Sequence, residues 1–476
     1  MDLGIFYFDP NTVVAFLARP TLNVLVDLMA LGGSLIFVFL FLRAGLFILE
    51  GYKGVSYMSD WKWVLLAIDI PSLNVQTPMA VEQLFNHLSG SYESPNLSEK
   101  FRTGYKQRWF SFEIISIEGY IQFLVRTEES LRDLVEAAIY AQYPDAEITE
   151  VEDYTNDLPN SFPNKEYDIW AADFVLSEHH GFPLRTYREF EHSISKDTVL
   201  KDPMGTFLES FSRLGPGEQM WFQMIVEPTD NSWKESVIAK VKEIIGEAKK
   251  SSFDLVHAVL DSPLKLLEAV GDQVFSREAS ASKKDDKPAE PNKIRYLTPG
   301  QSKLVESMEE KINKVGLKTK LRGIYLARKE VFRQDRGVAA LIGAISQFNR
   351  PNANSLEPAL RTDYIAYFFK EYRTNFHKTI MMNAYKKRKI KTGENPYVLN
   401  IEELATIWHF PMSHVKTPLV QKAEGKRSEP PAMLPVETVL APVIEMPREE
   451  KTVDGRTSGY KTDSGAITDD SDLKFG

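Results

Sequence analysis

The sequence predicts an α+β protein in which one N-terminal transmembrane helix is followed by a ferredoxin-like split βαβ module. A second, interrupted α+β module and a disordered C-terminal tail complete the expected chain. Three observations lead to this fold class: an almost uncharged apolar run near the N-terminus, strand and helix patterns through the middle, and an end rich in proline, glycine and aspartate. A chain of 476 residues is long enough for two or three folded units.

The apolar run extends from Leu22 to Leu42 and contains one charged residue, Asp27. About 20 apolar residues are enough to cross the hydrocarbon layer, so we expect a transmembrane helix at 21–43, preceded by a short interfacial segment at 1–20. A cleaved signal peptide, a buried core helix and a helix lying in the interface are the alternatives. Basic residues are more frequent after the run than before it, which predicts a single-pass protein of the inner (cytoplasmic) membrane with the bulk of the chain cytoplasmic.

Residues 61–156 show patterns in the order β-α-β-β-α-β, which is the order of a ferredoxin-like module. The run WKWVLLAIDIP predicts a buried strand, and Thr77-Pro78 predicts the N-cap and first turn of the helix after it. Glu118-Gly119 joins two β-rich runs as a hairpin. A second amphipathic helix and an edge strand, AEITEVEDY, complete the module.

A second α+β module is expected at 165–411, with helix starts at Asp202-Pro203 and Thr298-Pro299. A polar stretch rich in proline, alanine and lysine interrupts it, which predicts a linker or insertion at about 247–297. Residues 412–476 are first proline-rich and then acidic, so we expect a disordered tail there.

The stretch VLNIEELATIWHFP ends the second module and predicts structure rather than chemistry. Asn400 followed three residues later by Glu403 is typical of a capping box. Ile401, Leu404 and Trp408 recur at helical spacing, and the acids and His409 lack the i, i+4 pairing that a zinc helix needs. We expect a short helix that is capped at Asn400, packs its apolar face into the core and ends at Pro411.

Signatures of catalysis are missing from the sequence. There is no cysteine, no phosphate-binding G-x-x-x-x-G-K-[ST] motif, no G-x-G-x-x-G and no G-x-S-x-G. The Glu178-His179-His180 cluster is a third alternative, a metal or hydrolase site, although neighbours on a strand point to opposite faces and would not all converge. We therefore predict no enzyme, no cofactor and no metal site.

One basic run is a candidate contact surface for nucleic-acid phosphates or anionic lipid. Tyr372, Phe376 and Tyr385 are interleaved with basic residues ahead of it. The alternative is a solvated loop, which the net charge of −9 favours. The predicted contact residues are Lys386, Lys387, Arg388, Lys389 and Lys391.

Several long motifs resemble an uncharacterised bacterial family of membrane-anchored proteins known only as a domain of unknown function. They are WVLLAIDIP…QTPMAVEQLFNHLSG, WFSFEIISIEGYIQFLVRT, DPMGTFLESFSRLGPGEQMWFQ and LNIEELATIWHFP, and the resemblance covers roughly residues 1–415. In longer relatives a similar region precedes a P-loop motor akin to the HerA/FtsK and type IV secretion ATPases. Since this chain has no P-loop, the resemblance implies a non-catalytic membrane component beside a separate motor.

The leading hypothesis is therefore a non-enzymatic scaffold whose α+β domains bind other proteins, with the lipid bilayer and a separate P-loop ATPase as partners. A type IV secretion or DNA-transfer-like apparatus is the context that the resemblance implies. Homo-oligomerisation is compatible with the sequence. The alternative is a membrane-tethered nucleic-acid-binding module that uses the basic run near 386–391.

Overall fold

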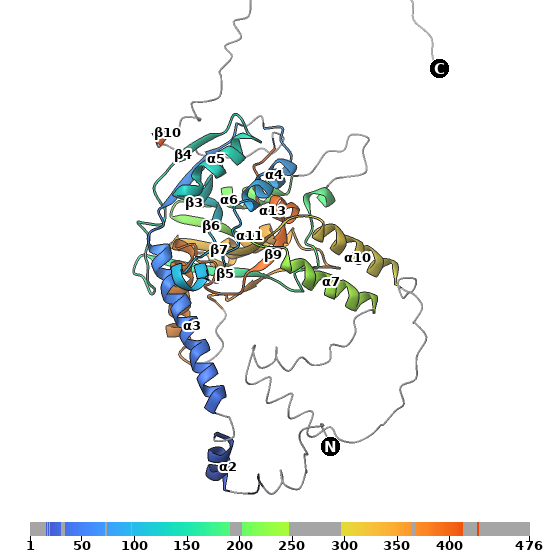
Figure 1. Ribbon diagram of the computed structural model, residues 1–476. Helices are drawn as coiled ribbons and strands as arrows, with labels where there is room; N and C mark the ends of the chain where they lie inside the picture. The colour runs from blue at the N-terminus through green and yellow to red at the C-terminus, as the bar shows by residue number, and fades with distance from the viewer. Residues whose placement is uncertain are drawn as a thin grey trace, which may run out of the picture. The chain divides into compact units, whose positions relative to one another are not determined.

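The computed structural model places most of the chain between Thr21 and Met412 (Figure 1). The expected linker at 247–297 and the expected tail at 412–476 lie almost entirely outside the described residues. The structure describes residues 16, 18, 20–29, 34–71, 74–96, 98–190, 202–246, 297–363, 368–412 and 426–427.

The N-terminal part contains two helices, α2 (Thr21–Leu28) and α3 (Ser34–Ser59). Among the described residues, no helix combines the length and the apolar character that a membrane crossing requires. The predicted transmembrane helix at 21–43, and the single-pass inner-membrane location that depended on it, are therefore wrong. The apolar residues are divided between an eight-residue helix and a longer one that carries Arg43, Glu50 and Lys53 within its length.

The first half of the sheet has the strand order β4-β1-β3-β2, with every neighbouring pair antiparallel. This is the arrangement of a split βαβ module, in which β3 lies between β1 and β2. Glu118 and Gly119 form the predicted hairpin turn, both with positive φ. The elements are β1 (Trp63–Asp69), α4 (Pro78–Ser89), η2 (Glu99–Thr103), β2 (Phe110–Ile117), β3 (Tyr120–Glu128), η3 (Glu129–Leu131), α5 (Arg132–Tyr140) and β4 (Glu147–Glu150).

The second half has the order β6-β7-β5-β8, again antiparallel throughout. Its third strand lies between its first two, so it repeats the split βαβ arrangement of the first half. Asp202 caps α6 by accepting from the backbone N–H of Met204, as predicted. The elements are β5 (Tyr167–Leu176), η4 (Tyr187–Phe190), α6 (Pro203–Ser212), β6 (Glu218–Pro228), α7 (Ser232–Ile245), α10 (Pro299–Ile312), β7 (Gly316–Arg328), α11 (Gln334–Ser346) and β8 (Leu356–Ala359).

The two halves are joined into one sheet by an antiparallel ladder between β2 and β6, from Phe110–Val226 to Ile117–Gln219. With the short strands β9 (Tyr397–Asn400) and β10 (Lys426–Arg427), the described residues form a ten-stranded sheet. The second strand of each half therefore pairs with its counterpart in the other half. The α+β class is confirmed, as a large antiparallel sheet.

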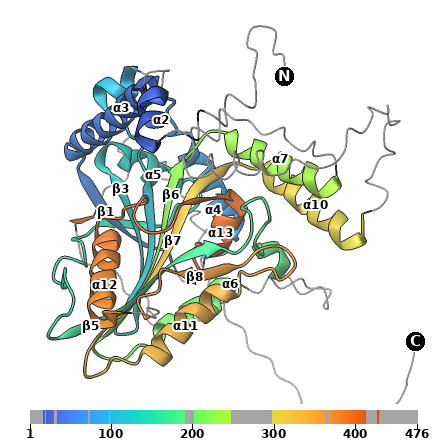
Figure 2. The same cartoon turned by 90° about the horizontal axis from the view of Figure 1, so that it is seen from below.

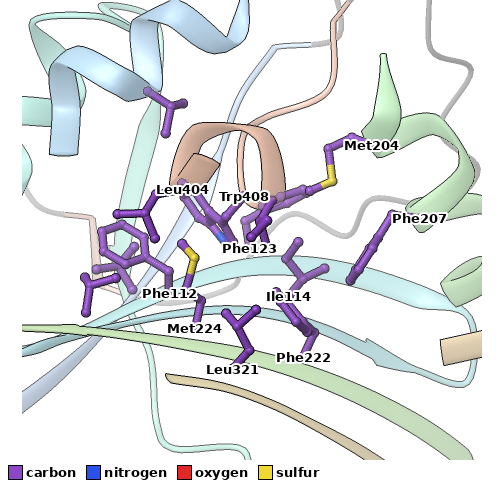
Figure 3. Close-up of a cluster of buried hydrophobic side chains, with 14 of the residues drawn as sticks. Phe112, Ile114, Phe123, Met204, Phe207, Phe222, Met224, Leu321, Leu404 and Trp408 are labelled. Atoms are coloured by element: carbon purple, nitrogen blue, oxygen red, sulfur yellow. The ribbon is translucent and has the colours of Figure 1, made fainter. Parts of the chain in front are cut away.

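Helices cover both faces of this sheet. Helices α4, α5, α6, α11 and α13 (Ile401–Ile407) pack on one face, and α12 (Lys370–Lys386) packs on the other (Figure 2). On the first face, Trp408 lies among Phe112 and Phe123, with ring centroids 4.8 and 5.8 Å away (Figure 3). Alternate side chains such as Leu66 and Ala67 enter opposite cores, as the period of two requires.

Helices α7 and α10 lie side by side at one end of the sheet and share a small core of their own with β9 (Figures 1 and 2). Trp233 of α7 packs directly against Gly316, where a Cβ atom would come within 2.6 Å of the indole ring. The expected insertion therefore falls between two helices that pack against each other.

Candidate functional site

The predicted contact residues lie at the end of α12 and in the loop that follows it. Lys387, Lys389 and Lys391 are exposed. Lys386 is half-buried, and its Nζ donates to a backbone carbonyl oxygen at 2.6 Å. Arg388 is fully buried. The structure thus brings three of the five residues to the surface and holds the other two against the protein.

Arg388 lies at the centre of a buried ion-pair network. Its guanidinium donates from Nε and Nη2 to the carboxylate of Glu113 on β2, at 2.9 and 3.1 Å, and it also bonds Asp153. Burial by itself raises the pKa of Glu113, but Arg388 and the hydroxyls of Ser111 and Tyr154 hold that pKa below its ordinary value. The donors of Arg388 are therefore used inside the protein.

A second buried pair fastens the backbone of the same loop to the sheet. Arg322 on β7 donates from Nε to Asp173 at 2.8 Å and from Nη1 to the carbonyl oxygen of Lys389 at 2.8 Å. Lys320 donates to the carbonyl oxygen of Thr392 at 2.8 Å, and burial lowers the pKa of Lys320 to about 8. Because these hydrogen bonds hold the main chain of the loop, the positions of the exposed lysines along it are fixed relative to the sheet.

The start of α12 exposes four aromatic side chains, which we call the α12 aromatic patch. Tyr372 and Phe376 stack with ring centroids 6.4 Å apart and an interplanar angle of 8°. Lys370 and Arg373 are exposed on the same helix. Clustered exposed aromatic residues beside a basic group are typical of binding surfaces. The patch consists of Phe368, Phe369, Tyr372 and Phe376, whose exposed fractions run from 54 to 86 %.

Comparison with protein families places the chain in a known group of sequences. A family model described as a domain of unknown function, DUF8128, matches residues 96–423, which is more than half of the chain. The chain belongs to the DUF8128 family. No curated protein matches it. The expectation of a family of unknown function is confirmed, and membership of DUF8128 by itself assigns no chemistry.

In this DUF8128 chain, the loop after α12 also lines a cavity of about 370 Å³ beside α3. A cavity of this size fits a small ligand. Its two carboxylates already have partners, since Lys106 lies 3.0 Å from Glu50 and Lys318 lies 3.4 Å from Glu227. Burial raises the pKa of Glu227. The lining includes Phe47, Glu50, Met58, Lys106, Trp109, Glu227, Lys389, Ile390 and Lys391.

The two adjacent histidines of the DUF8128 chain do not lie on a strand, so their side chains do not point to opposite faces as expected. They lie in a turn after β5, and the rings of His179 and His180 lie against each other, with centroids 4.3 Å apart and an interplanar angle of 31°. Burial, and then His179, lowers the pKa of His180 to about 4. Within the described residues, no group of three or more His, Asp or Glu side chains has a metal-binding arrangement.

The stretch at 398–411 is structural, as predicted. Asn400 and Glu403 form a complete capping box, and Trp408 is fully buried. Glu403 is also buried, and its carboxylate lies 2.9 Å from the ammonium group of Lys311. His409 is hydrogen-bonded at 2.8 Å to Asp202, the cap of α6. These buried polar contacts join α13 to α10 and α6.

Sequence reasoning named Tyr372 and Phe376 but missed Phe368 and Phe369 as members of the exposed patch. The available signal was four aromatic residues in nine positions, mixed with charged residues rather than with aliphatic ones. That mixture gives α12 a polar first half, while Met381 and later residues enter the core.

Proposed function

We propose that this DUF8128 chain is a non-enzymatic interaction scaffold, and that the α12 aromatic patch is the surface that binds a partner protein. The single observation that carries this proposal is the patch itself, because four aromatic rings more than half exposed are costly unless they are covered. Aromatic residues lose little conformational entropy on binding and dominate the energetics of protein interfaces.

The partner class is a separate P-loop ATPase of a secretion or DNA-transfer-like apparatus. The resemblance to the N-terminal regions of HerA/FtsK-like and type IV secretion-like proteins supports this choice. The charges of Lys370 and Arg373 beside the patch favour a partner surface with an apolar centre and acidic residues at its rim.

The test is affinity capture of the full-length chain from its own cells, read by mass spectrometry. We expect a P-loop ATPase that is recovered with the native chain and lost with the variant Phe369→Ser/Tyr372→Ser. The matched control is Met79→Ser/Tyr120→Ser, which removes exposed apolar residues elsewhere. If no ATPase is captured, or if the two variants behave alike, the proposal fails.

The second candidate is nucleic-acid binding by the basic run. The observation in its favour is the exposure of Lys387, Lys389 and Lys391 on a loop whose backbone is hydrogen-bonded to β7, since clustered lysines can neutralise successive phosphates. Anisotropy of a fluorescent single-stranded oligonucleotide tests it. Binding should weaken steeply with salt and be abolished by Lys387→Glu/Lys389→Glu/Lys391→Glu. No binding at low salt would end this alternative.

A further inference from the structure

Helix α3 carries a heptad pattern that its own fold leaves uncovered. Apolar and small residues recur at alternating spacings of three and four, which is the periodicity of a helix that pairs with another helix in a left-handed coiled coil. We call this line of residues the α3 seam. It consists of Val38, Phe41, Gly45, Ile48, Tyr52 and Val55.

The α3 seam is open along its whole length. The five side chains larger than glycine are between 54 and 75 % exposed. At Gly45, an added Cβ atom would meet no atom within 4 Å. Toward the C-terminal end of α3 the opposite side of the helix is occupied, since Glu50 pairs with Lys106 at 3.0 Å and Gly54 is buried against the same lysine.

Charge is absent from the seam and from the positions that flank it. In a coiled coil the flanking positions meet the partner helix, and like charges there prevent identical helices from pairing. The charged residues Arg43, Glu50 and Lys53 all fall elsewhere on the helix. The flanking positions hold Phe37, Leu42, Ala44, Leu49, Gly51, Ser56 and Met58.

We propose that α3 pairs in parallel with α3 of a second copy of this chain through the α3 seam. In a parallel pair each seam residue meets its own copy, so all layers form at once and Gly45 lets the two helices approach closely. Five large side chains at this exposure present roughly 500 Å² per chain. The pair then buries about 1,000 Å² in total, which reaches the lower bound for a specific interface. The inference is independent of the partner proposed for the α12 aromatic patch.

Sedimentation equilibrium of the full chain tests the pairing. We expect a dimer whose dissociation constant rises about 100-fold or more in Phe41→Asn/Ile48→Asn. The matched control is Phe39→Asn/Leu46→Asn, which changes an aromatic and an aliphatic residue at the same spacing of seven, outside the seam and about half exposed. We expect only a few-fold change for the control, and circular dichroism shows whether both variants fold.

Because the chain has no cysteine, a single introduced thiol reports on the contact directly. Oxidation should link Ile48→Cys into a covalent dimer and leave Arg43→Cys, on the other side of α3, unlinked. A monomeric native chain, equal weakening by both double variants, or equal cross-linking of both thiols would overturn the proposal. A monomer that floats with phosphatidylglycerol vesicles would assign the seam to lipid and overturn it as well.

Discussion

Replacing Arg388 with methionine should destabilise the fold strongly, although this residue lies within a run of surface lysines. The variant leaves the Glu113 carboxylate fully buried without its ionic partner. Breaking one half of a buried pair typically costs about 3–5 kcal/mol. Glu113 keeps hydrogen bonds from Ser111, Tyr154 and Gln223, at 2.6, 2.8 and 3.0 Å, so we expect a loss near the lower end, about 3 kcal/mol.

The assay is equilibrium urea unfolding followed by tryptophan fluorescence at pH 7. Methionine retains a side chain at the positive φ of 46°, so backbone strain at position 388 is similar in both proteins. The double variant Arg388→Met/Glu113→Gln should recover at least half of the loss, because it removes the uncompensated charge. The matched surface control, Lys387→Met, should change stability by no more than about 0.5 kcal/mol.

The effect of Arg388→Met should also depend on pH with a defined sign. In the native protein the pKa of Glu113 is depressed, so its ionisation stabilises the fold above the ordinary carboxyl pKa, and that contribution is lost as the pH falls. In the variant, burial without Arg388 favours the protonated acid, so the difference between the two proteins should shrink toward acidic pH. A loss below about 1 kcal/mol at pH 7, equal to that of Lys387→Met, would refute the reasoning.

Three further predictions concern single substitutions. Lys311→Met should cost about 3–5 kcal/mol, because it leaves Glu403 buried without its cation; a urea midpoint unchanged from that of the native chain would contradict this. Gly393→Ala should cost about 1–3 kcal/mol in the same assay, because φ is +91° and an added Cβ atom would lie 2.2 Å from a buried carboxylate oxygen. The control Gly343→Ala lies in open space on α11 and should be neutral or stabilising by up to about 1 kcal/mol. The depressed pKa of His180 means that the unfolded chain binds a proton more readily than the native one, so stability present above pH 6.5 should be lost as the pH falls toward about 4; unfolding midpoints across that range should show a smaller loss for His180→Gln.

Local patterns in the sequence were sufficient for most secondary structure. The hairpin at Glu118-Gly119, the cap at Asp202 and the capping box at Asn400 each depend on residues a few positions apart, which a sequence displays directly. The membrane expectation failed because composition was averaged over a run that the fold divides between α2 and α3. An apolar composition shows that a segment avoids water, but it does not show where a helix begins or ends.

Long-range pairing was not predictable in the same way. Nothing local to Arg388 distinguishes it from Lys387 or Lys389, because its burial depends on Glu113, 275 positions earlier in the chain. The basic run was therefore interpreted as one surface, whereas the fold buries Arg388 and exposes three of the lysines. The pairing of β2 with β6 was hidden for the same reason, since the pattern of each strand alone indicates only that it is buried.

Because β2 and β6 join both halves into one sheet, the folded unit is larger than the segment that the family model matches. The family match begins at residue 96, yet β1 lies between β3 and β4, and its residues Leu66 and Ala67 contribute to both cores. A fragment that began at residue 96 would expose one side of each of these neighbouring strands. Helix α4 would be absent as well, and with it the contact between Phe85 and Phe112, whose ring centroids lie 4.9 Å apart. The folded unit therefore begins no later than β1, and α3, which precedes β1 and contacts η2, lies next to a unit that the family match only partly covers.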